Sequence, residues 1–247
     1  MKSLFAITLL FIIAGCSHST YETYTAENLE LDSTYNSTDL ESLIAPYRNE
    51  VDAQMSEIIG ICDSTLIKYA PESPLGNFAA DVVFEKGIKL SPPGFSNMGR
   101  HNTFALLNFG GLRAPINKGD ITIGNVFELM PFDNTITIVH VDAAGVMDLI
   151  EYMFIMNGQP ISNATFDLTE KDRQMFVNEL PVELNRTGVY IITSNYLASG
   201  GDKMDFLKNS TQKWDSGVLI RDVFIEHIKS THTISNTGID GRLIISK

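Results

Sequence analysis

Three short segments of the chain carry polar and aromatic side chains that together could hold a small ligand. They are Asn108–Arg113 (Asn-Phe-Gly-Gly-Leu-Arg), Pro131–Asn134 (Pro-Phe-Asp-Asn) and Asn195–Asp202 (Asn-Tyr-Leu-Ala-Ser-Gly-Gly-Asp). Each follows a hydrophobic, strand-like run and contains Gly or Pro, so each is expected to form a turn. Four of their side chains are two flat rings, Phe132 and Tyr196, and two opposite charges, Arg113 and Asp202. Together these suit the base, phosphate and sugar hydroxyls of a nucleotide.

Each of these residue types also has an ordinary structural explanation. An isolated aromatic ring is more often part of a core, and an arginine is often simply solvated. Asn and Asp after a strand often cap a turn. The pairs Gly110-Gly111 and Gly200-Gly201 allow close approach of the backbone to a ligand, but they suit hairpin turns equally well. The ligand hypothesis therefore depends on the combination of the three segments.

The first residues of the chain have the order of a bacterial secretion signal. Lys2 precedes an apolar run from Leu4 to Ile13, and Ala14-Gly15-Cys16 follows. A cysteine at this place resembles a lipobox, so residues 1–16 are predicted to be a lipoprotein signal peptide with Cys16 as the lipidated residue. The alternative is a plain secretion signal with an incidental cysteine. Lipidation would place the protein in the cell envelope, on the periplasmic or surface side of a bacterial membrane.

The rest of the chain divides into a polar tether and a domain. Residues 17–37 are rich in Ser, Thr, Asn, Tyr and Glu without an apolar period, and residues 38–247 are long enough for a domain with a sizeable core. If Cys16 is lipidated, Cys62 has no partner for an intramolecular disulfide. The formal net charge of −12 argues against a nucleic acid polymer as partner. One local arginine could still bind a small anion.

Hydrophobic periodicity predicts a mixture of helices and strands. Helices are expected at 38–55, after Ser73-Pro74, at 142–157 and at 216–230. Strands are expected at 58–69 (one or two), 104–108, 121–123, 135–141, 165–168, 182–184, 188–195 and 242–245. Because strands and helices do not alternate strictly, we expect a mixed α+β fold with mixed sheets rather than a doubly wound parallel sheet.

Five ordered motifs between about Ile58 and Leu207 resemble the C-terminal, substrate-binding domain of the 5′-nucleotidase family. The motifs are Glu72–Asn77 with Asp81, Asn108–Arg113, Gly119–Thr122, Pro131–Asn134 and Asn195–Asp202. The resemblance implies a four-layer α/β/β/α domain with mixed sheets. It also implies that Phe132 and Tyr196 sandwich a base and that Asp202 accepts hydrogen bonds from ribose hydroxyls. Arg113 would contact phosphate or ribose, and Asn108 and Asn134 would be polar contacts near base and sugar.

In that family, hydrolysis is performed by an N-terminal metallophosphatase domain that holds two metals on motifs such as Asp-x-His and Gly-Asn-His-Asp/Glu. Neither motif occurs in this sequence, and its five histidines have no supported metal-binding spacing. We therefore expect no catalytic residue, metal or other cofactor in this chain. The resemblance implies that a divalent metal pair would be carried by a separate metallophosphatase partner.

Two ligand-binding functions remain open, beside a third option, an envelope interaction protein whose pocket is vestigial. The chain could be the nucleotide- or nucleoside-binding half of a phosphohydrolase of nucleotide catabolism that acts with a metallophosphatase. Alternatively, it could be a non-catalytic envelope lipoprotein that binds nucleosides or nucleotide sugars. The second hypothesis is favoured by a departure from the family, whose members often carry another arginine where this chain has Pro71 or Asn77.

Overall fold

The computed structural model describes residues 38–90, 92–183 and 188–247. Contacts divide the chain into two compact units, Met1–Pro46 and Tyr47–Lys247. Helix α2 (Thr38–Met55) begins where the sequence predicted, and none of its residues is buried. No helix in the described ranges is both long and apolar enough to cross a membrane. The predicted signal peptide, Cys16 and the tether lie outside the described residues.

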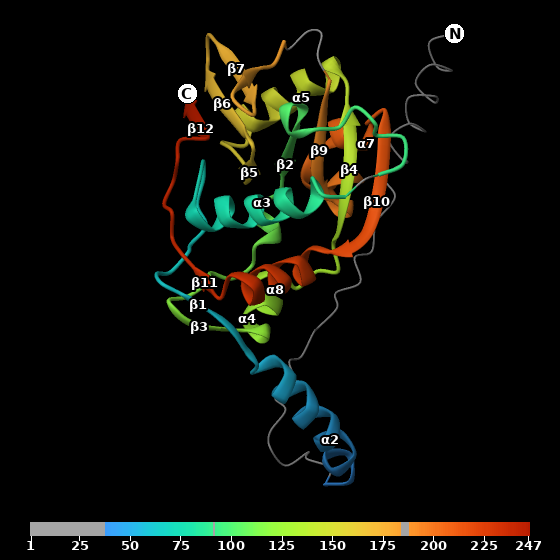
Figure 1. The fold of residues 1–247 in the computed structure, drawn as a ribbon, viewed down its shortest axis with the longest axis vertical. Helices are drawn as coiled ribbons and strands as arrows, with labels where there is room; N and C mark the ends of the chain where they lie inside the picture. The colour runs from blue at the N-terminus through green and yellow to red at the C-terminus, as the bar shows by residue number, and fades with distance from the viewer. Residues whose placement is uncertain (1–37, 91, 184–187) are drawn as a thin grey trace, which may run out of the picture. The chain divides into compact units, whose positions relative to one another are not determined.

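A five-stranded mixed sheet forms the centre of the second unit (Figure 1). Its strands, in spatial order, are β10 (Gln212–Leu219), β4 (Thr135–Val141), β9 (Val189–Ser194), β2 (Thr103–Leu106) and β5 (Ile161–Ser162). Strands β2 and β9 are parallel, and the other neighbours are antiparallel. The β-branched runs at 135–141 and 188–195 thus become adjacent central strands, as their composition favours.

Both faces of this sheet are covered, so the domain has two hydrophobic cores. Alternate residues of one strand contribute to different cores, Ala105 to one and Phe104 and Leu106 to the other. Helices α3 (Pro74–Gly87) and α8 (Ile220–Thr231) pack in the first core. Helix α5 (Ala143–Ile155) and a second sheet pack in the other.

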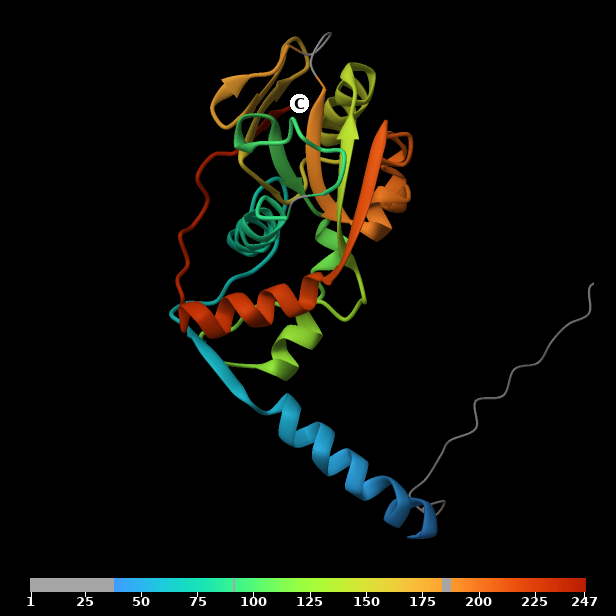
Figure 2. The same ribbon diagram turned by 45° about the vertical axis from the view of Figure 1, so that its right-hand side comes forward.

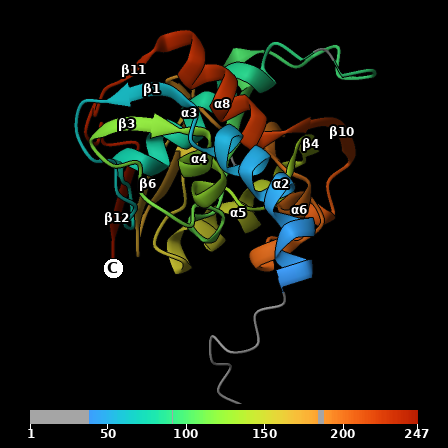
Figure 3. The same ribbon diagram turned by 90° about the horizontal axis from the view of Figure 1, so that it is seen from below.

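Two smaller sheets complete the fold, and both are mixed. One consists of β11 (Thr233–Ile234), β1 (Ile58–Cys62) and β3 (Gly119–Thr122), which lie side by side in Figure 3. The other consists of β12 (Leu243–Ser246), β6 (Ala164–Thr169), β7 (Arg173–Val177) and β8 (Leu180–Pro181). The remaining helices are η3 (Arg100–Asn102), η4 (Phe109–Gly111), α4 (Ile123–Leu129), α6 (Asn195–Ala198), η5 (Gly201–Lys203) and α7 (Asp205–Lys208). The predicted mixed α+β class is confirmed.

Local sequence explains where the two longest core helices begin. The Ser73 hydroxyl accepts a hydrogen bond from the backbone N–H of Gly76 at 3.2 Å, and Pro74 occupies the first turn of α3. The Asp142 carboxylate caps α5 in the same way, accepting from Gly145 at 3.0 Å. Both caps satisfy a backbone donor that has no partner inside its own helix.

The structure corrects four of the predicted elements. The predicted helix at 216–230 is wrong at its start, because residues to Leu219 belong to strand β10 and α8 begins at Ile220. Only Ile58–Cys62 of the run 58–69 is a named strand. The strand predicted at 121–123 ends at Thr122, whose side chain caps α4. The weak strand predicted at 182–184 is replaced by Leu180–Pro181.

The Glu72–Asn77 motif and Asp81 support the domain rather than the site. Arg242 donates to Asp81 at 2.8 Å and to Asp240 at 2.5 Å, with only 13% of its side chain exposed. Buried Glu72 accepts from the Asn77 side chain at 2.7 Å and from the Asp240 backbone at 2.8 Å. This network joins helix α3 to the segment that enters the last strand.

Candidate ligand-binding site

Four adjacent strands of the central sheet direct their connections to the same edge. Strands β2 and β9 end there, β4 begins there, and β10 ends there in α8, as the pairing directions require. Ile136 pairs with Ser194, and just beyond this pair the Thr135 backbone N–H donates to Asn195 Oδ1 at 3.3 Å, so the start of β4 lies beside the start of the segment Asn195–Asp202. The sheet therefore brings together segments that are far apart in the sequence.

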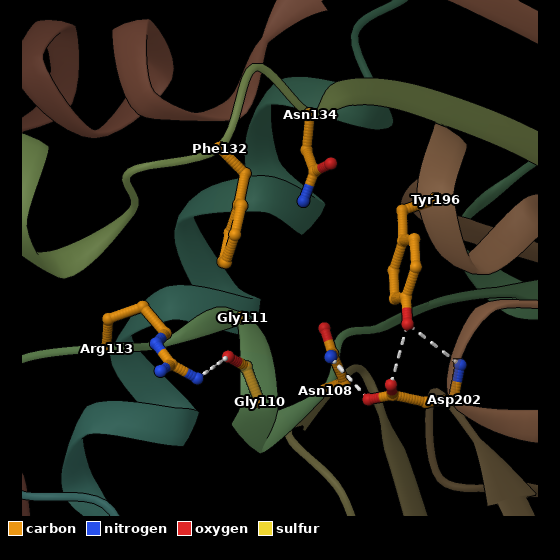
Figure 4. Close-up of a pocket in the computed structure, with 8 residues that line it drawn as sticks. All are labelled: Asn108, Gly110, Gly111, Arg113, Phe132, Asn134, Tyr196 and Asp202. Atoms are coloured by element: carbon orange, nitrogen blue, oxygen red, sulfur yellow. Dashed lines mark hydrogen bonds between the residues drawn. The ribbon is translucent and has the colours of Figure 1, made fainter. Parts of the chain in front are cut away.

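A pocket of about 310 Å³ lies at this edge. Its lining contains all six side chains that the sequence analysis selected, together with two glycines: Asn108, Gly110, Gly111, Arg113, Phe132, Asn134, Tyr196 and Asp202. Figure 4 shows the rings of Phe132 and Tyr196 on opposite sides of the pocket, with the Asn134 amide directed between them. The volume is at the lower end of the range found for small-molecule sites.

Asp202 is the centre of the polar side of the pocket. Its Oδ2 accepts a hydrogen bond from Asn108 Nδ2 at 2.6 Å, and its Oδ1 accepts one from the Tyr196 hydroxyl at 2.9 Å. An ionised carboxylate has about four acceptor sites, so two remain for donors from a ligand. The same hydrogen bond to Oδ1 holds the Tyr196 ring while 47% of that residue stays exposed.

The backbone at Asp202 is in the left-handed region, with φ 50° and ψ 30°. Few residues other than glycine adopt this conformation, although Asp tolerates it better than most. The Tyr152 hydroxyl donates to the Asp202 carbonyl oxygen at 3.1 Å and so supports the turn from behind. Burial raises the pKa of Tyr152 to about 12, helped by the charge of Asp202 and opposed by a hydrogen bond with Gln159.

Two glycines leave room for the side chains of the site. A Cβ at Gly201 would lie 2.5 Å from two carbon atoms of the Tyr196 ring. A Cβ at Gly111 would lie 2.8 Å from the Asn108 side-chain oxygen. Any other residue at these positions would displace a group that faces the pocket.

The loop 130–134 between α4 and β4 presents Phe132, of which 43% is exposed. The Asn134 side-chain amide has no hydrogen-bond partner among the described residues, and its backbone carbonyl accepts from Ile220 at 2.9 Å. Arg221, which the sequence analysis did not select, donates to Asp133 in this loop at 2.7 Å. The sequence places Arg221 in a predicted helix, and nothing in that pattern indicates a contact with this loop.

Arg113 is the cation of the pocket. Its guanidinium makes one long hydrogen bond, 3.4 Å, to the Gly110 carbonyl, and it forms no ion pair within the described part of the chain. The turn before Arg113 is held from outside by Lys68, whose ammonium donates to the carbonyls of Phe109 and Leu112. Lys68 is a second supporting residue that sequence patterns did not indicate. The guanidinium itself is therefore available to an anion.

Other charged candidates lie elsewhere. Arg100 forms a two-pronged ion pair with Glu85 at 2.9 and 2.7 Å and lies outside the pocket lining. Across the described ranges there is no group of three or more His, Cys, Asp or Glu side chains that could hold a metal ion. The pocket lining offers two rings for stacking, side chains for hydrogen bonding and two opposite charges.

Comparison with known proteins links this geometry to a family. The family described as 5′-nucleotidase, C-terminal domain, matches residues 58–209, which is more than half of the chain. The match includes every residue that lines the pocket.

Individual relatives share about a quarter of the aligned residues with this chain and are much longer than it. A trifunctional nucleotide phosphoesterase protein of Bacillus subtilis is 24% identical over 226 residues, which is 80% of this chain and 14% of that protein. An apyrase of Aedes aegypti is 25% identical over 227 residues, which is 83% of this chain and 38% of the apyrase. The crystal structure of a 5′-nucleotidase precursor from Thermus thermophilus superposes with a TM-score of 0.67 at 25% identity, covering 83% of this chain and 42% of that one. The chain thus spans less than half the length of each of these three proteins.

Proposed function

The chain belongs to the 5′-nucleotidase C-terminal domain family, and from this premise we propose that its pocket binds a nucleotide or nucleoside. The observation that carries the proposal is the pocket itself. Two partly exposed rings stand on opposite sides of it, and an acceptor carboxylate and an unpaired cation share its lining (Figure 4). These groups match the three chemical parts of a nucleotide.

The base would lie between Phe132 and Tyr196. Phe132 is 43% exposed and Tyr196 47%, so part of each ring is accessible to a ligand. A base stacked on aromatic side chains gains about 1–3 kcal/mol, and every base has the flat face that this contact needs. The Asn134 amide, directed between the rings, offers a donor and an acceptor to the base or the sugar.

The sugar and phosphate would contact the two charged side chains of the pocket, Asp202 and Arg113. Asp202 retains acceptor capacity for ribose hydroxyls after its bonds to Asn108 and Tyr196. The planar guanidinium of Arg113 suits phosphate oxygens, and it has no carboxylate partner to displace among the described residues. In this arrangement Asn108 orients the carboxylate and contacts the ligand at the same end of the pocket.

Phosphate hydrolysis would need a partner. The described residues do not fit a metal site, so no catalytic step is assigned to them. We propose that a metallophosphatase with two divalent metals meets this domain at the pocket, as in the two-domain family, and that the pair acts in nucleotide catabolism. The test is whether the purified pair associates and releases phosphate from 5′-nucleotides; a pair that does neither overturns this part of the proposal.

The lipid anchor remains part of the proposal. The order Ala14-Gly15-Cys16 supports acylation of Cys16 and attachment to a bacterial membrane facing the periplasm or the surface. Metabolic labelling with a fatty acid should mark the wild-type protein and not Cys16→Ala. Label on both proteins would contradict the anchor.

The decisive test of the pocket is calorimetric titration of the purified chain with 5′-AMP and with adenosine. Phe132→Ala should lower the affinity for both ligands by about 5–150-fold, because the base loses one stacking partner. Tyr69→Ala is the matched control, because Tyr69 is 44% exposed and does not line the pocket. Equal affinity in wild type and Phe132→Ala would contradict the base clamp.

A second function is favoured by one observation. Among the residues that the structure describes, Arg113 is the only cation that lines the pocket. A non-catalytic envelope protein that binds nucleosides or nucleotide sugars would need no stronger phosphate contact. Such a protein should bind adenosine as tightly as 5′-AMP, whereas a strong preference for 5′-AMP supports the nucleotidase.

A further inference from the structure

Arg221 holds the loop that carries Phe132. Only 8% of this residue is exposed. Its guanidinium donates to the carbonyls of Met130 and Phe132 at 3.4 and 3.5 Å and to the Asp133 carboxylate at 2.7 Å. It also lies over the Phe127 ring, 4.1 Å from the centroid. The planar fork of donors in arginine is suited to several acceptors that lie in one plane.

The neighbouring residue adds another contact to the same loop. The backbone N–H of Ile220 donates to the Asn134 carbonyl at 2.9 Å. Strand β10 runs directly into α8 beside this loop, as Figure 2 shows. The first two residues of α8 therefore bond every residue of the loop except Pro131.

The position of Arg221 is unfavourable for helix α8 considered alone. The N-terminus of a helix carries a partial positive charge, so a cation in the first turn is disfavoured. Burial of a guanidinium is also costly unless it is well bonded, and Arg221 Nε has no hydrogen-bond partner in the structure. The benefit of this arginine must therefore lie outside its own helix, in the loop that it bonds.

We propose that Arg221 is a positioning residue that presents the Phe132 ring to the base. This inference rests on the proposed function. Phe132 is 43% exposed, so it has little packing of its own to hold the ring in place. A loop fixed before the ligand arrives loses less conformational freedom on binding, which raises affinity. Arg221 acts only through the loop, because it does not line the pocket.

A double-mutant cycle tests this mechanism in the full chain with adenosine as the probe. Arg221→Met should lower the affinity for adenosine by about tenfold or more, because the charged hydrogen bonds to the loop are lost. In the Phe132→Ala background the same substitution should lower the affinity for adenosine by no more than about threefold, because the ring that Arg221 positions is gone. An equal loss in both backgrounds would overturn the proposal, since a general structural role would not depend on Phe132.

Two milder variants keep the test decisive if Arg221→Met does not fold. Arg221→Lys retains a charge for Asp133 but cannot reach two carbonyls as well, so it should give an intermediate loss of affinity. Asp133→Asn removes only the ion pair, on a carboxylate side chain that is 79% exposed, and should fold normally with a smaller loss. Wild-type affinity in both variants would overturn the proposal.

Hydrogen exchange separates this proposal from the proposed function, because it needs no ligand. The backbone amides of Met130 and of residues 132–134 should exchange faster in Arg221→Lys than in wild type, while those of the central strand β4 should not. Unchanged exchange in the loop overturns the proposal even if wild type binds adenosine. Faster exchange supports the conclusion that Arg221 restrains the loop, whether or not wild type binds a nucleoside. If wild type then binds no nucleoside, the proposed function fails.

Discussion

The Asn108 side chain donates a hydrogen bond of 2.6 Å to Asp202, a residue 94 positions later in the chain. Asn108 follows β2, and Asp202 lies in the turn after β9, the parallel neighbour of β2. Each residue would be an ordinary turn residue in isolation. The hydrogen bond fixes the direction of a carboxylate that faces the pocket, so the local sequence at either end does not determine the site by itself.

Replacing Asp202 should reveal the sugar contact. Asp202→Asn keeps one acceptor for Asn108 but removes the charge, so adenosine should bind about 10–100-fold more weakly. Calorimetry with 2′,3′-dideoxyadenosine provides the control, because this ligand lacks the hydroxyls that Asp202 would accept from. A similar loss of affinity for both ligands would show that Asp202 shapes the pocket without binding ribose.

Gly201→Ala should disturb the Tyr196 ring. The new methyl group would lie 2.5 Å from ring carbons, and relief of such overlap costs about 1–3 kcal/mol. Adenosine affinity should fall by about tenfold if part of that cost appears on binding. In a Tyr196→Ala background the substitution should have no further effect on affinity. A persistent effect there would mean that Gly201 serves the turn and not the ring.

Tyr152→Phe should change the alkaline stability of the protein. Burial raises the pKa of Tyr152 to about 12, above the ordinary value of about 10. The folded state therefore favours the neutral hydroxyl. This contribution is fully present below about pH 10 and is lost as pH rises to about 12.

The measurement for Tyr152 is urea denaturation at several pH values. The stability of wild type should fall more steeply than that of Tyr152→Phe between about pH 10 and about pH 12. Ultraviolet absorbance offers a second readout, since one of the eight tyrosines of wild type should ionise late and be missing in the variant. Parallel pH profiles for the two proteins would refute the assignment.

Arg242→Met should destabilise the fold without altering ligand affinity. The substitution removes the charged hydrogen bonds to Asp81 and Asp240 from a side chain that is 13% exposed, so the free energy of unfolding should fall by about 1.5–3 kcal/mol. Arg100→Met is the matched control, because its ion pair with Glu85 is about half exposed and should contribute no more than about 1 kcal/mol. Similar losses from the two variants in urea denaturation would be inconsistent with a supporting network around Arg242.

Several elements could be predicted because their signals are local. The Ser73-Pro74 pair marks the start of α3, and the branched residues of 135–141 mark β4. The six candidate ligand residues could be selected because they carry distinctive chemistry in three turn segments that resemble motifs of a known family. The prediction that each segment follows a strand is wrong for residues 131–134, which follow helix α4 and precede β4. Their meeting in one pocket is a finding of the structure, and their contacts with a ligand stay predictions.

Other elements could not be predicted because their signals depend on tertiary contacts. No residue of strand β10 is buried, and the strand has a register shift between Asp215 and Leu219, with Gly217 at φ +69°, so its sequence carries no strong hydrophobic pattern. Arg221 and Lys68 resemble surface cations in the sequence. Only the fold places Arg221 under the loop 130–134 and Lys68 against the Phe109–Leu112 turn.

The convergence of four strands on one edge has a consequence for how binding preference can change. Phe132, Asp202 and Arg113 stand on three different connections, while the strands behind them share one hydrogen-bonded frame. Asn108 bonds the Asp202 carboxylate, so the connections after β2 and β9 are coupled, whereas the loop 130–134 is bonded to α8 instead. The Phe132 ring could therefore change during evolution more freely than the groups around Asp202, provided that the loop keeps the acceptors that Arg221 bonds.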